Sequence, residues 1–249
     1  MREKKVLGIL GGLGPMSSVY FYEMLTSHTA AEVDQDHLNI LLSSRADIPD
    51  RTDFITGRSA SNPLPAMRSE VGKLARAGAE LIAIPCNTAH YFYEGVAESS
   101  PVPILNIINE TASFCASLGL SRVGVLATEG TARSGAYRDA LSERGIEYVT
   151  CEDADQRAVS EIIYGSVKQG KEPDIDEFLR VADSLTSRGC ERIILGCTEL
   201  SLLKKNCRLG IRFIDPLEVL AIRAISECGA LPKGFDTELM KACYEKGCK

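Results

Sequence analysis

The chain has 249 residues, of which 45% are hydrophobic and 25% charged, as is usual for a soluble globular protein. Its formal net charge of −6 argues against nucleic acid or an anionic membrane as a main partner. The apolar run at 6–10 is too short for a secretory signal, and no run reaches the roughly 20 apolar residues of a membrane span. We therefore expect a cytoplasmic protein.

Short apolar runs and segments of helical periodicity alternate along the chain. The predicted strands are, in order, 6–10, 38–42, 81–85, 102–108, 122–128, 147–149, 192–195 and 211–214. The predicted helices are 19–25, 64–77, 88–97, 109–118, 136–144, 159–168, 175–188 and 216–228. A polar, proline-marked loop at 43–62 is long enough to indicate a functional segment. Strands alternating with helices predict an α/β protein with parallel sheets flanked by helices.

The second half of the chain resembles the first. Residues 78–88 match residues 189–199 at a constant offset of 111, and each segment carries one cysteine after an apolar run, Cys86 and Cys197. The strand at 122–128 also resembles residues 5–11, with Gly124 opposite Gly8. We predict two similar lobes related by a pseudo-twofold axis. The first comprises 1–108 and 213–249 and carries Cys86; the second comprises 109–212 and carries Cys197.

Both cysteines follow a predicted strand and precede a predicted helix start. Ligands of open parallel sheets bind beyond the carboxyl ends of the strands, so the cleft between the lobes is the expected active site. Free backbone N–H groups and the helix dipole at such a position stabilise a thiolate, which then acts as a base. Two thiols facing one stereocentre can move a proton between its faces. The alternative without a catalytic role is a pair of duplicated structural turns that kept their cysteines.

The remaining candidates are weaker when taken alone. The nine cysteines are odd in number and irregularly spaced, which indicates reduced thiols rather than disulfides. With three histidines and no C-x-x-C sequence, a structural zinc site has little support. The glycines at 8–14 match the dinucleotide fingerprint poorly, and we interpret them as a tight turn that lets a small ligand approach the backbone. His90 is a candidate to orient the Cys86 thiol, and packing is its ordinary role.

The sequences PCNTAH at 85–90 and GCTE at 196–199 resemble those of the aspartate/glutamate racemase family, and most of all its aspartate racemase branch. The segments 8–15, 48–52, 126–131, 165–168 and 214–216 also fit, so the similarity covers about residues 5–225. Glutamate racemases usually have histidine where this chain has Glu199, which favours aspartate as the substrate. Leu13, expected on the floor of the pocket, stands where relatives often have methionine.

The resemblance implies a racemase that needs neither a metal nor pyridoxal phosphate. One of Cys86 and Cys197, as the thiolate, removes the α-proton, and the other returns a proton to the opposite face. The resemblance also implies two sets of substrate-binding residues. The α-carboxylate and amino group are held by Asn87, Thr88, Thr131 and Thr198. The side-chain carboxylate is received by Arg51 and Lys168, and a guanidinium suits this because it holds a carboxylate with two hydrogen bonds.

Other functions stay open at this point. Relatives that isomerise a diacid such as maleate, or racemise a hydantoin, also pair two cysteines. A protein that only binds acidic amino acids is a further alternative, although binding does not need the thiols. Glu199 either adjusts Cys197, binds an ammonium group or caps a helix. The family further implies a homodimer with a small acidic amino acid as its ligand.

Overall fold

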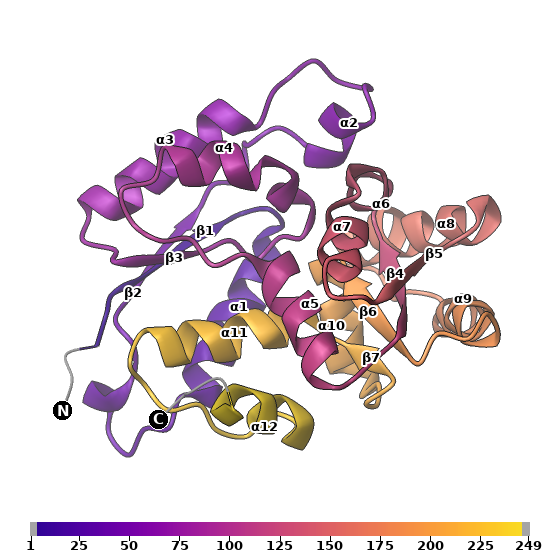
Figure 1. Ribbon diagram of the computed structural model, residues 1–249. Coiled ribbons are helices and arrows are strands. Elements are labelled where there is room, and N and C mark those ends of the chain that lie inside the picture. Colours follow the sequence, from indigo (N-terminus) through magenta and orange to yellow (C-terminus); the bar gives the residue numbers. More distant parts are fainter. Residues whose placement is uncertain (1–3, 246–249) are drawn as a thin grey trace.

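In the computed structural model, which describes residues 4–245, the strands form two separate parallel sheets (Figure 1). The first has the order β2-β1-β3, with bounds Ile40–Ser44, Leu7–Gly11 and Leu81–Ala83. The second has the order β5-β4-β6-β7, with bounds Glu147–Thr150, Arg122–Ala127, Arg192–Gly196 and Phe213–Ile214. The predicted fold class, two parallel α/β lobes, is confirmed.

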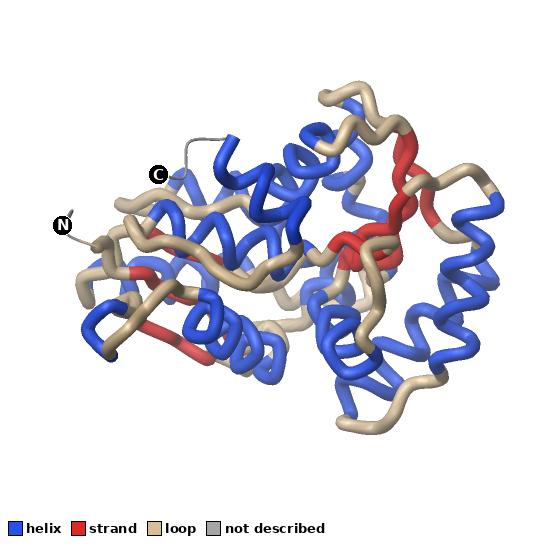
Figure 2. Tube along the Cα trace, turned by 90° about the horizontal axis from the view of Figure 1, so that it is seen from below, coloured by secondary structure: helices blue, strands red, loops and turns tan. Residues whose placement is uncertain are grey.

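Helices cover both sheets. The α-helices are α1 (Pro15–His28), α2 (Arg51–Ile55), α3 (Leu64–Arg76), α4 (Tyr93–Glu98), α5 (Ile107–Ser117), α6 (Glu129–Ser134), α7 (Ala136–Ser142), α8 (Asp153–Ser160), α9 (Ile175–Ser187), α10 (Thr198–Cys207), α11 (Pro216–Glu227) and α12 (Thr237–Glu245). The 3-10 turns are η1 (Asp34–Asp36), η2 (Thr88–Phe92) and η4 (Val167–Gln169), and η3 (Glu161–Ser166) is a π-helical turn. Figure 2 shows the strands in two groups with helices packed between and around them.

The internal repeat is visible in the register of the sheets. Gly8 of β1 lies opposite Ile82 of β3, and Gly124 of β4 lies opposite Ile193 of β6. These are the residues that the two halves of the sequence equate. Glycine is needed at the first position because a Cβ on Gly8 would lie 2.8 Å from the Cβ of Ala79. At the equivalent position, a Cβ on Gly124 would lie 3.3 Å from Cys190 Sγ, and Cys190 is the counterpart of Ala79 in the repeat.

The predicted strand at 102–108 is wrong in extent. Ile104 makes only an isolated parallel bridge with Ile82, and α5 already begins at Ile107. Pro101 and Pro103 lack a backbone N–H, so this segment cannot donate a regular ladder of hydrogen bonds. The predicted helix at 88–97 begins as the turn η2 and becomes α-helical at Tyr93.

The last strand lies in the second sheet, whereas the predicted lobe boundary at residue 213 assigned it to the first lobe. Residues 213–214 pair with β6 in parallel. Helix α11 then contacts β3 of the first sheet and β6 of the second, and it packs on α1 and α5. The division into 1–108 plus 213–249 and 109–212 stays a prediction, and its residues 1–3 and 246–249 lie outside the described part, as does Cys248.

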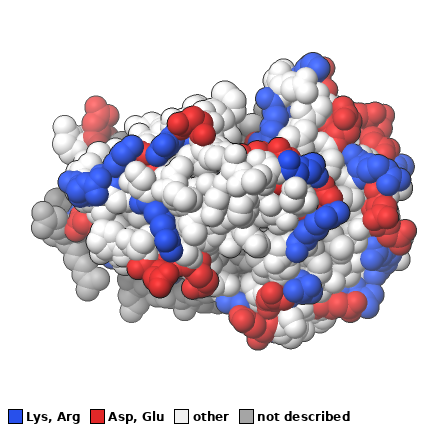
Figure 3. Space-filling model, turned by 90° about the horizontal axis from the view of Figure 1, so that it is seen from above, with Lys and Arg blue, Asp and Glu red and all other residues white. Residues whose placement is uncertain are grey.

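The largest apolar cluster joins the two lobes. It includes buried residues of β1, β4, α1, α5 and α11, while two smaller clusters fill the outer side of each sheet. On the face shown in Figure 3, basic and acidic side chains are interspersed without an extended basic band. Among the described helices, none combines the length and apolar character required to cross a membrane.

Candidate active site

A small cavity of about 10 Å³ lies between the lobes, beyond the carboxyl ends of β1, β3, β4 and β6. Nine of the ten predicted site residues line it: Leu13, Arg51, Cys86, Asn87, Thr88, Lys168, Cys197, Thr198 and Glu199. The sequence did not single out four other lining residues: Asp50, Thr52, Thr128 and Tyr164. Three of those four lie in or beside segments that carried the family resemblance, 48–52 and 126–131. The cavity thus collects residues from both halves of the chain.

The two thiols reach this cavity from equivalent strand ends. Cys197 directly follows β6 and is the N-cap residue of α10. Cys86 follows β3 after two further residues and precedes the turn η2. Both side chains are buried, with relative exposures of 5% for Cys197 and 6% for Cys86. Both thiols are therefore largely withdrawn from bulk water in this structure.

Burial, and not the helix dipole, controls the acidity of the thiols here. It raises the pKa of Cys86, although the charge of Arg51 acts in the opposite direction. It raises the pKa of Cys197 well above the ordinary value, and the Glu199 carboxylate adds to this rise. The expected stabilisation by backbone N–H groups is present, since the N–H of Ala89 lowers the pKa of Cys86 and that of Glu199 lowers the pKa of Cys197, but burial outweighs it in the closed site. Removal from water destabilises a thiolate by more than the backbone N–H groups of the following helical turn stabilise it.

Glu199 links Cys197 to Lys168. The Cys197 thiol donates to Glu199 Oε2 over 2.8 Å, and Glu199 Oε1 accepts from Lys168 Nζ at 2.6 Å. Burial lowers the pKa of Lys168, but the neighbouring Glu199 carboxylate raises it above the ordinary value overall. Of the three roles expected for Glu199, the structure agrees with the one in which Glu199 contacts and adjusts the Cys197 thiol. A Cβ on Gly14 would lie 2.9 Å from Glu199 Oε1, so the glycine-rich turn admits this carboxylate.

Two buried nitrogen donors at the cavity have no hydrogen-bond partner. Tyr137 donates its hydroxyl to Asn87 Oδ1 over 2.6 Å, which leaves Asn87 Nδ2 without an acceptor. Arg51 donates from Nη1 to the carbonyls of Ile48 and Pro49, while its Nε is unpartnered. A buried donor without an acceptor costs about 1–3 kcal/mol, so both nitrogens are suited to an anionic ligand.

Three threonine hydroxyls join the lobes beside Cys86. Thr88 Oγ1 lies 3.0 Å from Thr128 Oγ1 and 2.8 Å from Thr131 Oγ1, and the latter two are 3.1 Å apart. Thr128 and Thr88 line the cavity, whereas Thr131 lies behind Thr88 and is not among the lining residues described. Thr131 thus orients the Thr88 hydroxyl in this structure.

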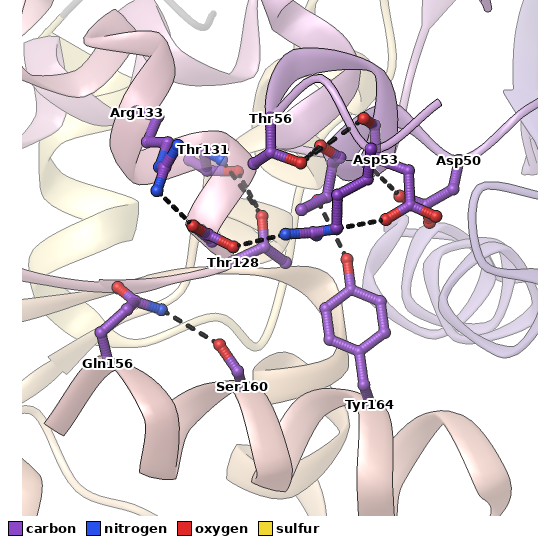
Figure 4. Close-up of polar contacts among 12 residues, drawn as sticks. Asp50, Asp53, Thr56, Thr128, Thr131, Arg133, Gln156, Ser160 and Tyr164 are labelled. Carbon is purple, nitrogen blue, oxygen red and sulfur yellow. Dashed lines mark hydrogen bonds and ion pairs between the residues drawn. The ribbon is translucent and has the colours of Figure 1, made fainter. Parts of the chain in front are cut away.

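The predicted functional loop at 43–62 closes the cavity from one side. Its short helix α2 brings Thr52 Oγ1 within 2.9 Å of the Tyr164 hydroxyl of the other lobe, and Tyr164 is drawn in Figure 4 reaching toward this segment. Arg58 pairs with Glu129 across the same gap at 2.7 Å. A Cβ on Gly130 would come within 2.8 Å of Thr52, so this glycine permits the lobes to meet. The site is therefore shielded from water.

His90 holds the backbone around Cys86 and not the thiol. Its Nε2 accepts from the N–H of Ile107 at 3.2 Å, so the proton resides on Nδ1, which donates to the Cys86 carbonyl over 2.8 Å. The imidazole is 6% exposed, and burial lowers its pKa. A neutral His90 connects the turn after β3 to the start of α5.

This arrangement predicts an acid-sensitive contribution to stability. Above about pH 6.5, the ordinary pKa of histidine, both folded and unfolded chains carry neutral His90. As the pH falls below that value, the unfolded chain binds a proton that the folded chain excludes. We expect a loss of up to about 1.4 kcal/mol per pH unit from this group.

Urea denaturation at about pH 7 and about pH 5.5 measures this loss. The variant His90→Gln keeps a donor and an acceptor but does not titrate. Its free energy of unfolding should depend less steeply on pH than that of the wild type. Equal pH dependence in the two proteins would show that His90 does not contribute.

The sequence of this chain is similar to those of a known protein family. Residues 10–224 match the family model described as Asp/Glu/Hydantoin racemase. The chain is 29% identical to the broad specificity amino-acid racemase RacX of Bacillus subtilis (strain 168), covering 89% of this chain and 97% of that one.

Solved structures agree with this match. The aspartate racemase of Picrophilus torridus is 31% identical, with a TM-score of 0.77, covering 92% of this chain and 96% of that one. An aspartate racemase homologue from Pyrococcus horikoshii OT3 is 26% identical, with a TM-score of 0.72, and the match covers 90% of this chain and 99% of that one.

Proposed function

Since the chain belongs to the Asp/Glu/Hydantoin racemase family and is an amino acid racemase, we propose that its substrate is an acidic amino acid, with aspartate preferred. We further propose that no cofactor takes part and that Cys86 and Cys197 are the two acid–base groups. One observation carries this proposal: thiols from equivalent strand ends of the two lobes line the same buried cavity.

In the proposed reaction each thiol serves one face of the α-carbon. A thiolate removes the α-proton, the substrate becomes a planar carbanion, and the opposite thiol returns a proton to the other face. Burial raises the pKa of both thiols, the charge of Glu199 raises both further, and that of Lys168 lowers both, whereas Arg51 acts to lower the pKa of Cys86. We propose that the thiolate forms at Cys86 and that Cys197 is the thiol in the resting pair.

Glu199 completes the proton path on the second side. Its Oε2 accepts the Cys197 proton across 2.8 Å, so it is placed to take that proton when Cys197 must act as the base. Lys168 stabilises the carboxylate at 2.6 Å. The reverse direction of racemisation, which starts with deprotonation by Cys197, thus depends on Glu199.

Preference for an acidic substrate is supported by the unpartnered donors. Asn87 Nδ2 and Arg51 Nε each need an acceptor, and both are buried. An amino acid with a second carboxylate supplies one anionic group to each. With the α-carboxylate on Asn87, the Nδ2–H donor would stabilise the enolate-like charge that develops there during proton removal, while Arg51 would hold the side-chain carboxylate. Because the cavity is closed by α2, these contacts act without competition from water.

The test is a panel of substrates followed by chiral chromatography in D₂O. L-aspartate should yield D-aspartate with deuterium at the α-carbon, and L-glutamate should react more slowly. The panel includes maleate and a neutral amino acid such as L-alanine. Isomerisation of maleate without turnover of any amino acid would contradict the proposal, and so would tight binding of aspartate without exchange. The homodimer and the cytoplasmic location stay predictions.

A further inference from the structure

A second cavity, of about 390 Å³, lies toward the other end of α10 and shares no lining residue with the first. It is enclosed by α1, α10, α11, the segment before β7 and the start of α12. Its volume falls within the roughly 300–1,000 Å³ of sites for small molecules. Nothing in the proposed racemase chemistry uses it.

The charged groups of this cavity are mainly acidic. Four carboxylates line it, from Asp215, Glu218, Asp236 and Glu238, against the single ammonium of Lys204. Lys204 is paired with Glu218 at 2.7 Å. Burial, together with the charge of the neighbouring Asp215 carboxylate, raises the pKa of Glu218 to about 7. A cation in the cavity would relieve this repulsion between buried carboxylates.

One carboxylate oxygen of Asp215 is buried without a hydrogen-bond partner. The residue is 2% exposed and lines the cavity. Its Oδ1 accepts from the Ser201 hydroxyl at 2.7 Å and from the N–H of Leu217 at 2.8 Å. Its Oδ2 has no partner. An unpaired buried carboxylate oxygen is costly, so a positively charged donor is the natural complement.

Aromatic rings and aliphatic side chains form most of the remaining lining. The rings of Tyr20, Phe114, Phe213 and Phe235 line the cavity, and Phe235 stacks on His28 with ring centroids 4.2 Å apart. Aromatic rings combined with carboxylates recognise organic cations, because the ring faces attract positive charge and the carbon skeleton leaves water. In the described part of the chain, no group of three or more Asp, Glu, His or Cys side chains is arranged to hold a metal ion.

We propose that this cavity binds a small organic amine. Its ammonium group donates to Asp215 Oδ2, its charge is balanced by Glu218, and its carbon skeleton packs on the aromatic rings. The site also touches the catalytic helix, because Ser201 and Lys204 both belong to α10, which begins after Cys197. An effect of the amine on turnover follows from this contact and rests on the proposed function; the binding itself does not.

Titration calorimetry with phenethylamine tests the site. We expect a dissociation constant below about 1 mM, and binding at least about tenfold weaker for 2-phenylethanol, which has the same shape without the charge. Asp215→Asn and Glu218→Gln should each weaken phenethylamine binding by about tenfold or more. The control Glu172→Gln removes one negative charge from an exposed residue that lines neither cavity, and it should bind like the wild type.

The outcomes separate this proposal from that of the racemase. No binding of phenethylamine, or unchanged binding in both carboxylate variants with intact melting temperatures, overturns the amine site. Equal binding of 2-phenylethanol does so too, since the charge would then be irrelevant. Amine binding by a chain that turns over no amino acid would leave the site intact and overturn the proposed function.

Discussion

Replacing either Cys86 or Cys197 by serine should lower racemisation of aspartate by about a thousandfold or more. A serine hydroxyl has nearly the size of the thiol but is far less acidic, so it cannot serve as the base at neutral pH. Loss of a general acid or base costs roughly 10²–10⁴ in rate, and here each direction of the reaction uses both groups. The rate of D-aspartate formation, followed by chiral chromatography, measures the effect.

Cys207→Ser is the matched control. Cys207 ends α10, is exposed and does not line the cavity, so the same chemical change there should leave the rate within about twofold. Each active-site variant should also still bind aspartate, which calorimetry can confirm. Substantial turnover by either variant would remove the two-thiol mechanism, whatever the result for the other.

Arg51→Met should separate acidic from neutral substrates. Arg51 is 8% exposed, and its Nε has no partner in the protein. Removing one member of a buried charged pair costs about 2–5 kcal/mol, so kcat/KM for aspartate should fall by about 100-fold. Any turnover of L-alanine, which lacks the second carboxylate, should change far less. Steady-state kinetics on both substrates provide the comparison.

The control here is Arg76→Met, which removes an exposed cation on α3. It should leave both substrates unaffected. Arg51 also supports the loop through the carbonyls of Ile48 and Pro49, so the melting temperature of the variant must be measured. An equal loss of activity on aspartate and alanine in a folded variant would mean that Arg51 shapes the loop without recognising the carboxylate.

The sequence predicted the positions of the two thiols because those positions depend on local patterns. An apolar run followed by a cysteine and polar residues specifies a strand end, and the repeat of this pattern specifies a second one. Each parallel sheet brings such ends to its own carboxyl edge, and the edges of the two separate sheets face the same cavity. For this reason Cys86, Cys197 and seven other predicted residues line one cavity. The short helix α2 escaped prediction because it lacks a full period of apolar residues, and η2 was predicted as the first part of an α-helix at 88–97.

Other properties depended on which distant side chains meet. The acidity of the thiols was predicted in the wrong direction, because burial of Cys86 and Cys197 outweighs the helix start and no local pattern reveals burial. The ion pair of Glu199 with Lys168 joins residues 31 positions apart, and no local pattern predicts it.

By itself, the sequence of this chain determined the α/β class, the duplicated lobes and the placement of one cysteine at each equivalent strand end. These follow from periodicity and composition within short segments. Only the tertiary structure decided the charge and hydration around those thiols, the donors left free for a carboxylate, and the second cavity at Asp215. Such features arise where residues far apart in the chain exclude water together, and that exclusion is a property of the packed whole.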